Sequence, residues 1–363
     1  MVGVGRIGLC LGLNLERAGY EVLGVDKNRD HVRRLNERSF HSPEPGVEAA
    51  LGAARALRVC DRLDEVRDFG PALVLVAVDT PPAAVGGYDH SRVDQVIDGL
   101  VGMGPAPRRT ELVVVCTTLP GYCDSKAAAA GERGYALSYN PGFVAQGSIM
   151  RDQQLPRQVL IGQADPTAGD AIERMHRRIC LDAPAVHRLS RLDAEIAKLA
   201  TNCFLTMKIA FANGIGDLAT KVGADAQAIL AAVGADDRIG AECLQYGFAY
   251  GGPCFPRDNR ALDHFARQQG HELLQARATD EMNHAHAAFQ LAEYLRSHAE
   301  DEAIHFNSVT YKPGTEILEE SPPLDLAVEL ARAGRRVVLH DRPAVLAQVR
   351  ARFGALFEYR DET

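Results

Sequence analysis

The sequence lacks any long apolar stretch and contains few cysteines. Its longest purely apolar run, Leu73–Val78 with its flanks, has the length of a strand, well short of the roughly 20 residues that span a bilayer. The first residues do not follow the basic, apolar and small-residue order of a signal peptide, so no leader is expected. The 8 cysteines include no C-x-x-C pair. We therefore predict reduced thiols, a cytoplasmic protein and no metal site.

An excess of basic charge is also absent. The chain has 40 Lys and Arg against 48 Asp and Glu, a formal charge of −8. Nucleic acid and membrane are therefore not expected partners, although a local basic pocket for a small anion is left open. The 46% of hydrophobic and 24% of charged residues exclude disordered, collagen-like and coiled-coil classes. The length of 363 residues predicts two to three domains.

Residues 1–165 alternate short β-branched runs with helical patterns. Continuous apolar runs such as Leu73–Val78 are typical of a parallel sheet that is covered on both faces. The alternation predicts an α/β fold with a Rossmann-like, doubly wound parallel sheet. The expected strands are Val2–Val4, Glu21–Val25, Ala72–Val78, Glu111–Cys116 and Tyr135–Ser138, with helices at Ile7–Ala18 and Asp30–Glu37.

The rest of the chain changes character twice. A proline-free helical pattern runs from Asp193 to Val222 and opens an all-helical region, which a glycine-rich loop at Gly247–Asp258 interrupts. A third region starts near Ala303 and predicts one βαβ-like unit. The further expected helices are Asp225–Val233, Asn259–Gln268, Leu273–His298 and Pro323–Ala333, with strands at Ile304–Thr310 and Arg336–Leu339. We expect three domains: 1–188, doubly wound; 189–300, helical; and 301–363, a truncated α/β domain.

A dinucleotide fingerprint opens the chain. Gly3, Gly5 and Gly8 form G-x-G-x-x-G between a strand and a helix, where glycines allow a tight turn and close approach to a pyrophosphate. The next expected strand ends in Asp26, whose carboxylate would accept from a ribose hydroxyl and repel a 2′-phosphate. The pattern predicts NAD as cofactor, while Lys27 leaves NADP open and a ligand-free glycine turn is the alternative.

The first strand is expected to be unusually short, because only Met1 and Val2 precede the first glycine of the fingerprint, unless the sequence begins late.

A polar face lies on the long helical pattern. Glu195, Lys198 and Asn202 share one side of it by i+3 and i+4 spacing. A solvated stripe is the usual explanation for such a face. Since the surrounding pattern is apolar on most sides, we expect the face to line a cleft.

One cysteine stands apart from the others. Cys254 follows a run of glycines, which leave the backbone free to fold around a ligand. It also precedes an expected helix N-terminus and lies close to Arg257 in sequence, and these last two features favour a reactive thiolate. A buried, inert cysteine is the alternative. We expect most of the other cysteines to be small core residues.

These segments together resemble the UDP-glucose/GDP-mannose dehydrogenases, the nucleotide-sugar 6-dehydrogenases. Six ordered blocks and the fingerprint cover nearly the whole chain, and the Y-G-G-x-C-F-P block is the most specific. The blocks are Val78–Pro82, Thr117–Pro120, Tyr139–Phe143, Glu195–Asn202, Tyr250–Asp258 and Tyr311–Thr315.

The resemblance implies NAD-dependent oxidation of a primary alcohol to a carboxylate through an aldehyde. Cys254 matches the cysteine that captures the aldehyde as a thiohemiacetal, which a second hydride transfer converts to a thioester. Lys198 and Asn202 match the residues that stabilise the developing oxyanion. Asp258 matches an aspartate that works with an ordered water, and Thr118 a threonine that positions this water.

The resemblance also implies binding residues and an assembly. The implied partners are a nucleotide or nucleotide-sugar substrate and a second copy of the chain, in a homodimer formed through the long helix. The implied NAD-binding residues are Gly3, Gly5, Arg6, Ile7, Gly8, Asp26, Thr80 and Thr118. The implied substrate-binding residues are Phe143, Lys198, Asn202, Tyr250 and Gly251.

The chain departs from the family pattern at three places. Gly142 stands where the family has a glutamate implicated in thioester hydrolysis, and the same block has Ala145 and the neutral Gln146. Glu319 replaces an arginine that reaches the substrate phosphate of the partner subunit. The last domain is shorter than the family's.

These departures leave other functions open. Two alternatives remain: either Thr118 and Asp258 alone hold the hydrolytic water, or the enzyme stops at the aldehyde as a two-electron dehydrogenase. A smaller hydroxy acid as substrate and a non-catalytic, NAD-binding protein are further alternatives.

Overall fold

The computed structural model describes residues 1–84 and 86–361 and divides into two compact units, Met1–Lys198 and Leu199–Thr363. Each unit has its own sheet. Helix α9 (Arg191–Val222) begins in the first unit and continues through the boundary into the second. No helix among the described residues is long and apolar enough to cross a membrane.

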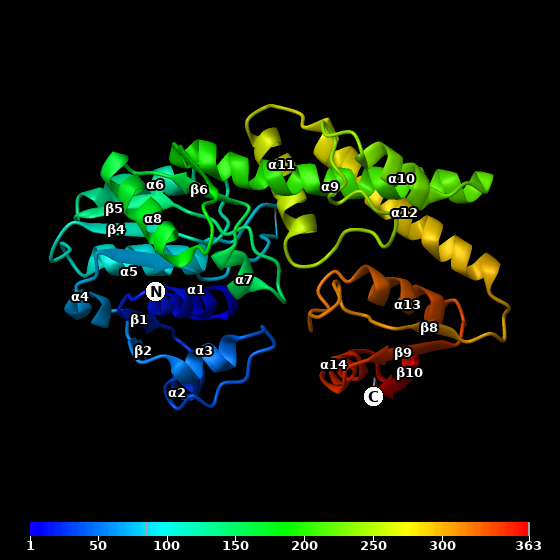
Figure 1. Cartoon of the computed structure of the whole chain (residues 1–363), viewed down its shortest axis with the longest axis horizontal. Coiled ribbons are helices and arrows are strands. Elements are labelled where there is room, and N and C mark those ends of the chain that lie inside the picture. The colour runs from blue at the N-terminus through cyan, green and yellow to red at the C-terminus, as the bar shows by residue number, and fades with distance from the viewer. Residues whose placement is uncertain (85, 362–363) are drawn as a thin grey trace. The chain divides into compact units, whose positions relative to one another are not determined.

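The first unit is built on a mostly parallel sheet (Figure 1). Val2 pairs with Val25 and with Val76, and so joins the pair β1–β2 to the series β3-β4-β5-β6-β7. All of these pairings are parallel except that between β5 and β6, which is antiparallel through Tyr139 and Gly162. The strands are β1 Val22–Val25, β2 Leu57–Cys60, β3 Leu73–Val76, β4 Thr110–Val114, β5 Tyr135–Tyr139, β6 Gln158–Gly162 and β7 Ala185–Leu189.

Helices cover this sheet on both faces, because its apolar strands bury alternate side chains on opposite sides. In β4, Val113 belongs to a core with α1 and α8, whereas Leu112 and Val114 belong to a core with α5 and α6. The helices are α1 Arg6–Arg17, α2 Arg29–Asn36, α3 Val47–Ala53, α4 Glu65–Phe69, α5 Ser91–Gly102, α6 Tyr122–Gly131, α7 Ile149–Gln154 and α8 Pro166–Ile179.

The second unit joins helices to a small parallel sheet of order β10-β9-β8. Apolar residues of these strands, of α13 and of α14 form its core. The helices are the rest of α9, α10 Ala226–Gly234, α11 Phe255–Gln268, α12 Leu274–Ser297, α13 Pro322–Arg332 and α14 Pro343–Phe353, with a 3-10 turn at Gly354–Leu356. The strands are β8 Ile304–Phe306, β9 Val337–Asp341 and β10 Glu358–Asp361.

The predicted fold class is confirmed: a Rossmann-like sheet, a helical middle and a smaller C-terminal α/β region. Three local predictions are wrong. The expected strand Val2–Val4 is reduced to the single-residue pairing of Val2. The glycine-rich loop ends at Cys254 rather than Asp258, because the proline of Phe255–Asp258 lies in the first turn of α11, where a proline is tolerated. The last twenty or so residues form α14 and β10, so the third region contains more than one βαβ unit.

His176, on α8, makes the stability of the first unit depend on pH. Its Nε2 lies 2.8 Å from Oδ1 of Asn140, and burial lowers its pKa from 6.5 to about 4. Between these two values the unfolded chain takes up a proton that the folded chain does not. The free energy of unfolding therefore falls as the pH drops from 6.5 towards 4.

We predict that His176→Gln, which keeps an amide donor for Asn140 but cannot titrate, flattens this pH dependence. Across the window the two proteins should diverge by up to about 3 kcal/mol in the free energy of unfolding. Urea unfolding at the two ends of the window measures the difference. Equal losses in both proteins would contradict the assignment.

Candidate active site

The glycine fingerprint lies between the Val2 pairing and helix α1. Gly3 has a φ of +85°, and a Cβ on it would lie 2.6 Å from the carbonyl oxygen of Ala77. A Cβ on Gly8 would overlap the carbonyl oxygen of Gly3. In contrast, nothing lies within 4 Å of a Cβ placed on Gly5, the N-cap of α1. The outer glycines are thus required by packing, and Gly5 leaves open space at a helix N-terminus that suits a phosphate.

Asp26 follows β1 and faces this loop. Its Oδ2 accepts from the backbone N–H of Val4 at 3.1 Å, and its Oδ1 accepts from that of Asn28 at 3.0 Å. Beside the loop lies a cavity of ≈ 270 Å³, lined by Gly5, Arg6, Leu9, Cys10, His31, Phe40, Ser42, Pro43 and Val47. An anion site at a helix end, a fixed carboxylate and an adjoining cavity fit a dinucleotide.

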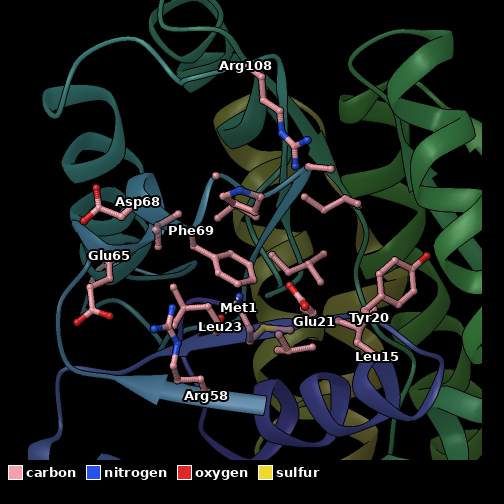
Figure 2. Close-up of a pocket in the computed structure, with 18 of the residues that line it drawn as sticks. Met1, Leu15, Tyr20, Glu21, Leu23, Arg58, Glu65, Asp68, Phe69 and Arg108 are labelled. Atoms are coloured by element: carbon pink, nitrogen blue, oxygen red, sulfur yellow. Dashed lines mark hydrogen bonds between the residues drawn. The ribbon is translucent and has the colours of Figure 1, made fainter. Parts of the chain in front are cut away.

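A second cavity, larger than the one beside the glycine loop, lies elsewhere in the first unit. It has a volume of ≈ 820 Å³, and Figure 2 shows it lined by Met1, Leu23, Arg58, Phe69 and Arg108 among others. Its lining includes the residues that precede or begin β1 and β3. The glycine loop follows Val2 at the opposite, carboxyl edge, where ligands of doubly wound sheets bind. This cavity is therefore separate from the cofactor site.

The polar face of α9 is buried rather than solvated. Glu195 is 0% exposed, and Lys198 and Asn202 are each 6% exposed. The solvated stripe that such spacing usually indicates is thus excluded. Lys198 closes the first unit, and Asn202 lies one turn further along the same helix.

Glu195 binds the segment that follows β4. Oε1 of Glu195 accepts from the hydroxyl of Thr118 at 2.9 Å and from the backbone N–H of Cys123 at 3.0 Å, while Oε2 accepts from the N–H of Gly121 at 2.7 Å. Burial raises the pKa of Glu195, and the hydrogen bonds oppose this shift. Thr80 joins the same segment, because its hydroxyl donates to the carbonyl oxygen of Thr117 at 2.8 Å.

Lys198 contacts the position at which the glutamate is missing. Its Nζ donates to the carbonyl oxygen of Gly142 at 3.0 Å and lies 4.3 Å from the ring centroid of Phe143. A Cβ on Gly142 would have Val144 as its nearest contact, at an ordinary 3.6 Å. The absence of a carboxylate at this position is therefore not enforced by packing.

The second unit brings together Asn202, Cys254 and Asp258. Asn202 Nδ2 donates to Oδ2 of Asp258 at 2.6 Å, and Asp258 is 1% exposed. Arg257 Nε lies 3.4 Å from the other oxygen of this carboxylate. Cys254 is the N-cap of α11, and its carbonyl oxygen accepts from the N–H of Asp258 at 2.8 Å.

The environments of the cysteines set Cys254 apart. It is the exposed one of the 8, all of which lie within the described residues. Burial raises the pKa of Cys10 and Cys203 to about 12 in each case, and that of Cys180 to about 11. A thiol must be accessible and able to ionise to act as a nucleophile. Cys254 meets the requirement of access, and it lies at the N-terminus of α11.

The loop before Cys254 is held by α12 and by the segment before α13. Tyr250 donates its hydroxyl to Oδ1 of Asp280 at 3.1 Å and its N–H to Oδ1 of Asn283 at 2.9 Å. A Cβ on Gly251 would collide with the carbonyl oxygen of Glu320, whose carboxylate forms an ion pair with Arg260 at 3.1 Å. Glu319, at the position of the expected arginine, is exposed.

The structure places the expected residues in three groups. The groups are Gly3–Gly8 with Asp26; Thr80, Thr118, Phe143 and Lys198; and Asn202, Tyr250, Gly251, Cys254 and Asp258. The contact between Glu195 and Thr118 could not be inferred from the sequence, because 77 residues separate them. The cavity residues His31 and Phe40 were also missed, because they follow the fingerprint at no fixed spacing.

The fold and the glycine loop define a dinucleotide-binding α/β protein with an appended helical region. Comparison with known proteins narrows this class. The model for the NAD binding domain of the UDP-glucose/GDP-mannose dehydrogenase family matches residues 1–180, and the model for its central domain matches residues 192–285. The chain belongs to this family.

Relatives and solved structures agree with this assignment. A UDP-glucose 6-dehydrogenase of Pseudomonas aeruginosa is 31% identical over 97% of this chain and 80% of its own length. A GDP-mannose 6-dehydrogenase of the same organism is 30% identical over 98% of this chain and 83% of its own length. The structure of a UDP-glucose dehydrogenase from Pyrobaculum islandicum superposes with a TM-score of 0.89 at 31% identity, covering 99% of this chain and 85% of that one.

The position of Asp26 yields a test of cofactor choice. We predict that Asp26→Ser raises the ratio of kcat/KM for NADP to that for NAD by about tenfold or more, because the carboxylate that repels a 2′-phosphate is removed. Steady-state kinetics with both cofactors measures the ratio. Asp30→Ser, which removes the same charge from the exposed start of α2, is the matched control. An equal ratio in both variants would contradict the role of Asp26.

Proposed function

We propose that the protein oxidises the primary alcohol of a nucleotide-linked sugar to a carboxylate, with two molecules of NAD as hydride acceptors. Family membership, together with an exposed thiol at the N-cap of α11, carries this proposal. The printed activities of the relatives, UDP-glucose and GDP-mannose 6-dehydrogenation, set the class of substrate.

NAD fits the first unit through the open space at Gly5, the N–H groups of α1 and the carboxylate of Asp26. When bound, it supplies the acceptor for hydride. The chain must position the alcohol carbon, stabilise negative charge on its oxygen and retain the aldehyde between the two oxidations. Thr80 and Thr118 belong to the cofactor-facing segment in this proposal.

The charge on the reacting oxygen is assigned to Lys198 and Asn202. A buried ammonium and an amide, one turn apart on α9, are suited to a developing oxyanion because they act in a water-poor environment. The amide of Asn202 is oriented by its hydrogen bond to Asp258. Phe143, Tyr250 and Gly251 are the further proposed substrate contacts.

Cys254 is the proposed nucleophile. Its sulfur adds to the aldehyde carbon to give a thiohemiacetal, which loses hydride to NAD and a proton to become a thioester. Water then adds to the thioester carbon, the carbon–sulfur bond breaks, and the carboxylate leaves. Asp258 is proposed to hold this water.

Counting NADH tests this reaction. With UDP-glucose or GDP-mannose as the limiting substrate, we predict two NADH per molecule oxidised. Cys254→Ala should stop the second oxidation because no thiohemiacetal can form, whereas Cys60→Ala, the matched control in β2, should retain two NADH. A Cys254→Ala variant that still yields two would contradict the thioester route.

A second candidate function is favoured by Gly142. Without a carboxylate at this position, a two-electron dehydrogenase that releases the aldehyde would yield one NADH per substrate. A count of one in the wild-type protein would establish this alternative in place of the four-electron reaction.

We further propose that the protein is a cytoplasmic homodimer. The exposed thiol of Cys254 requires a reducing compartment to stay reactive. On α9, Phe204, Phe211, Leu218 and Val222 are exposed at spacings of seven, seven and four residues, which places them along one side of the helix. An apolar stripe of this length is suited to bury itself against a second copy.

The dimer is tested by charge. Phe211→Asp combined with Leu218→Asp should yield monomers in sedimentation velocity, because two carboxylates would be desolvated in the interface. Thr220→Asp, at an exposed position two residues after Leu218 and therefore on a different side of the same helix, is the control and should leave the assembly unchanged. A double variant that sediments as the wild type does would contradict the proposed interface.

A further inference from the structure

Glu195 connects two parts of the first unit whose residues have proposed catalytic roles. One is the segment after β4, from Thr117 to Cys123. The other is α9, on which Lys198 follows Glu195 by three residues and therefore lies on the same face. Glu195 itself matches no role named so far.

Three donors of the segment converge on the carboxylate of Glu195. They are the hydroxyl of Thr118 and the backbone N–H groups of Gly121 and Cys123, at 2.9, 2.7 and 3.0 Å. Backbone N–H groups can only donate, so the oxygens of Glu195 are the acceptors of the bonds to Gly121 and Cys123. Hydrogen bonds to an ionised acceptor are stronger than neutral ones and fix the segment more tightly.

These bonds form part of a longer chain of contacts within the unit. Thr80 donates to Thr117, Thr118 donates to Glu195, one turn of α9 leads to Lys198, and Lys198 donates to Gly142. The proposed cofactor-facing residues are thus connected to the proposed oxyanion-stabilising ammonium by fixed contacts.

We infer that Glu195 is a positioning residue that fixes the distance between the cofactor-facing segment Thr117–Cys123 and Lys198. This inference rests on the proposed function. Its physical basis is the steep dependence of hydride transfer on geometry, since a displacement of about 1 Å can cost about a hundredfold in rate. Glu195 touches neither substrate nor cofactor and acts through Thr118 and the turn to Lys198.

The protonation state of Glu195 gives the inference a distinct signature. Protonation removes the negative charge and places a hydrogen on one oxygen, which weakens the bonds that Glu195 accepts from its three donors. The raised pKa of this buried group brings its protonation closer to the working range of pH. The positioning should therefore be lost at the acid side, as the pH falls through the pKa of Glu195, and kcat should fall with it. The other groups that face the carboxylate are Thr118 and the titratable Cys123 and Tyr139, and burial raises the pKa of both of these.

The experiment compares Glu195→Gln with Glu111→Gln. Glu111, on β4, is also a buried glutamate of the first unit, but it pairs with Arg109 and takes no part in the chain of contacts. Kinetics of the wild-type protein with UDP-glucose or GDP-mannose come first, because an inactive wild type refutes the proposed function and not the role of Glu195.

For Glu195→Gln we expect kcat to fall about tenfold or more, with little change in KM for NAD. We also expect that the fall of kcat at low pH, which the wild-type protein should show, is absent from this variant. Glu111→Gln should keep both kcat and the limb. A Glu195→Gln protein with the same kcat and pH profile as Glu111→Gln would overturn the inference. A Glu195→Gln protein that binds NAD more weakly but keeps its kcat would overturn it too.

Thr118 provides a second pair of variants should Glu195→Gln fail to fold. Thr118→Val removes the hydroxyl donor and should lower kcat, whereas Thr118→Ser restores the hydroxyl and should recover it. Where the double variant folds, Thr118→Val with Glu195→Gln should be no worse than the more damaging single variant, because both break the same contact. Additive losses, or no recovery with serine, would overturn the inference.

Discussion

A carboxylate that is removed from water must be given hydrogen-bond donors in exchange, and in this protein that constraint is met by Glu195. Its oxygens accept from the hydroxyl of Thr118 and the backbone N–H of Gly121, in the segment that links β4 to α6, and from the N–H of Cys123 in the first turn of α6. The carboxylate thereby binds the N-terminus of α6 and attaches the connection at the carboxyl end of β4 to α9. Lys198 is placed by the same helix, so the position of the ammonium depends on a contact made one turn earlier.

The differences from the family pattern lie around this framework and leave it intact. Gly142 offers a carbonyl oxygen to Lys198 where a glutamate side chain was expected, although a Cβ there would meet only ordinary contacts. Glu319 is exposed, while its neighbour Glu320 is engaged by Arg260 and by the backbone of Gly252. The residues that are proposed to act in the oxidation of the substrate are thus held by buried hydrogen bonds. The changes that concern hydrolysis and phosphate recognition stand at positions where packing tolerates them.

The sequence predicted those parts of the structure whose signal is local. The apolar runs of β1, β3, β4 and β5 and the glycine fingerprint were sufficient for the doubly wound fold, because buried parallel strands need continuous apolar residues. Strands β2, β6, β7 and β10 were not predicted. The sequences of β2, β7 and β10 mix charged and apolar residues, and β6 is a short apolar run of a kind that periodicity alone does not assign to a strand. The pairing of Thr118 with Glu195 could not be inferred from spacing, because tertiary packing brings together residues 77 positions apart.

The central chemical step of the proposed function is the conversion of a primary alcohol carbon of the substrate to a carboxylate carbon. UDP-glucose or GDP-mannose labelled with carbon-13 at that carbon, turned over with excess NAD and followed by NMR, observes the carbon directly. The account predicts that the alcohol signal is replaced by a carboxylate signal with no free aldehyde on the way, because the thiol of Cys254 retains the intermediate. A labelled aldehyde or its hydrate accumulating in solution as the end product would contradict it.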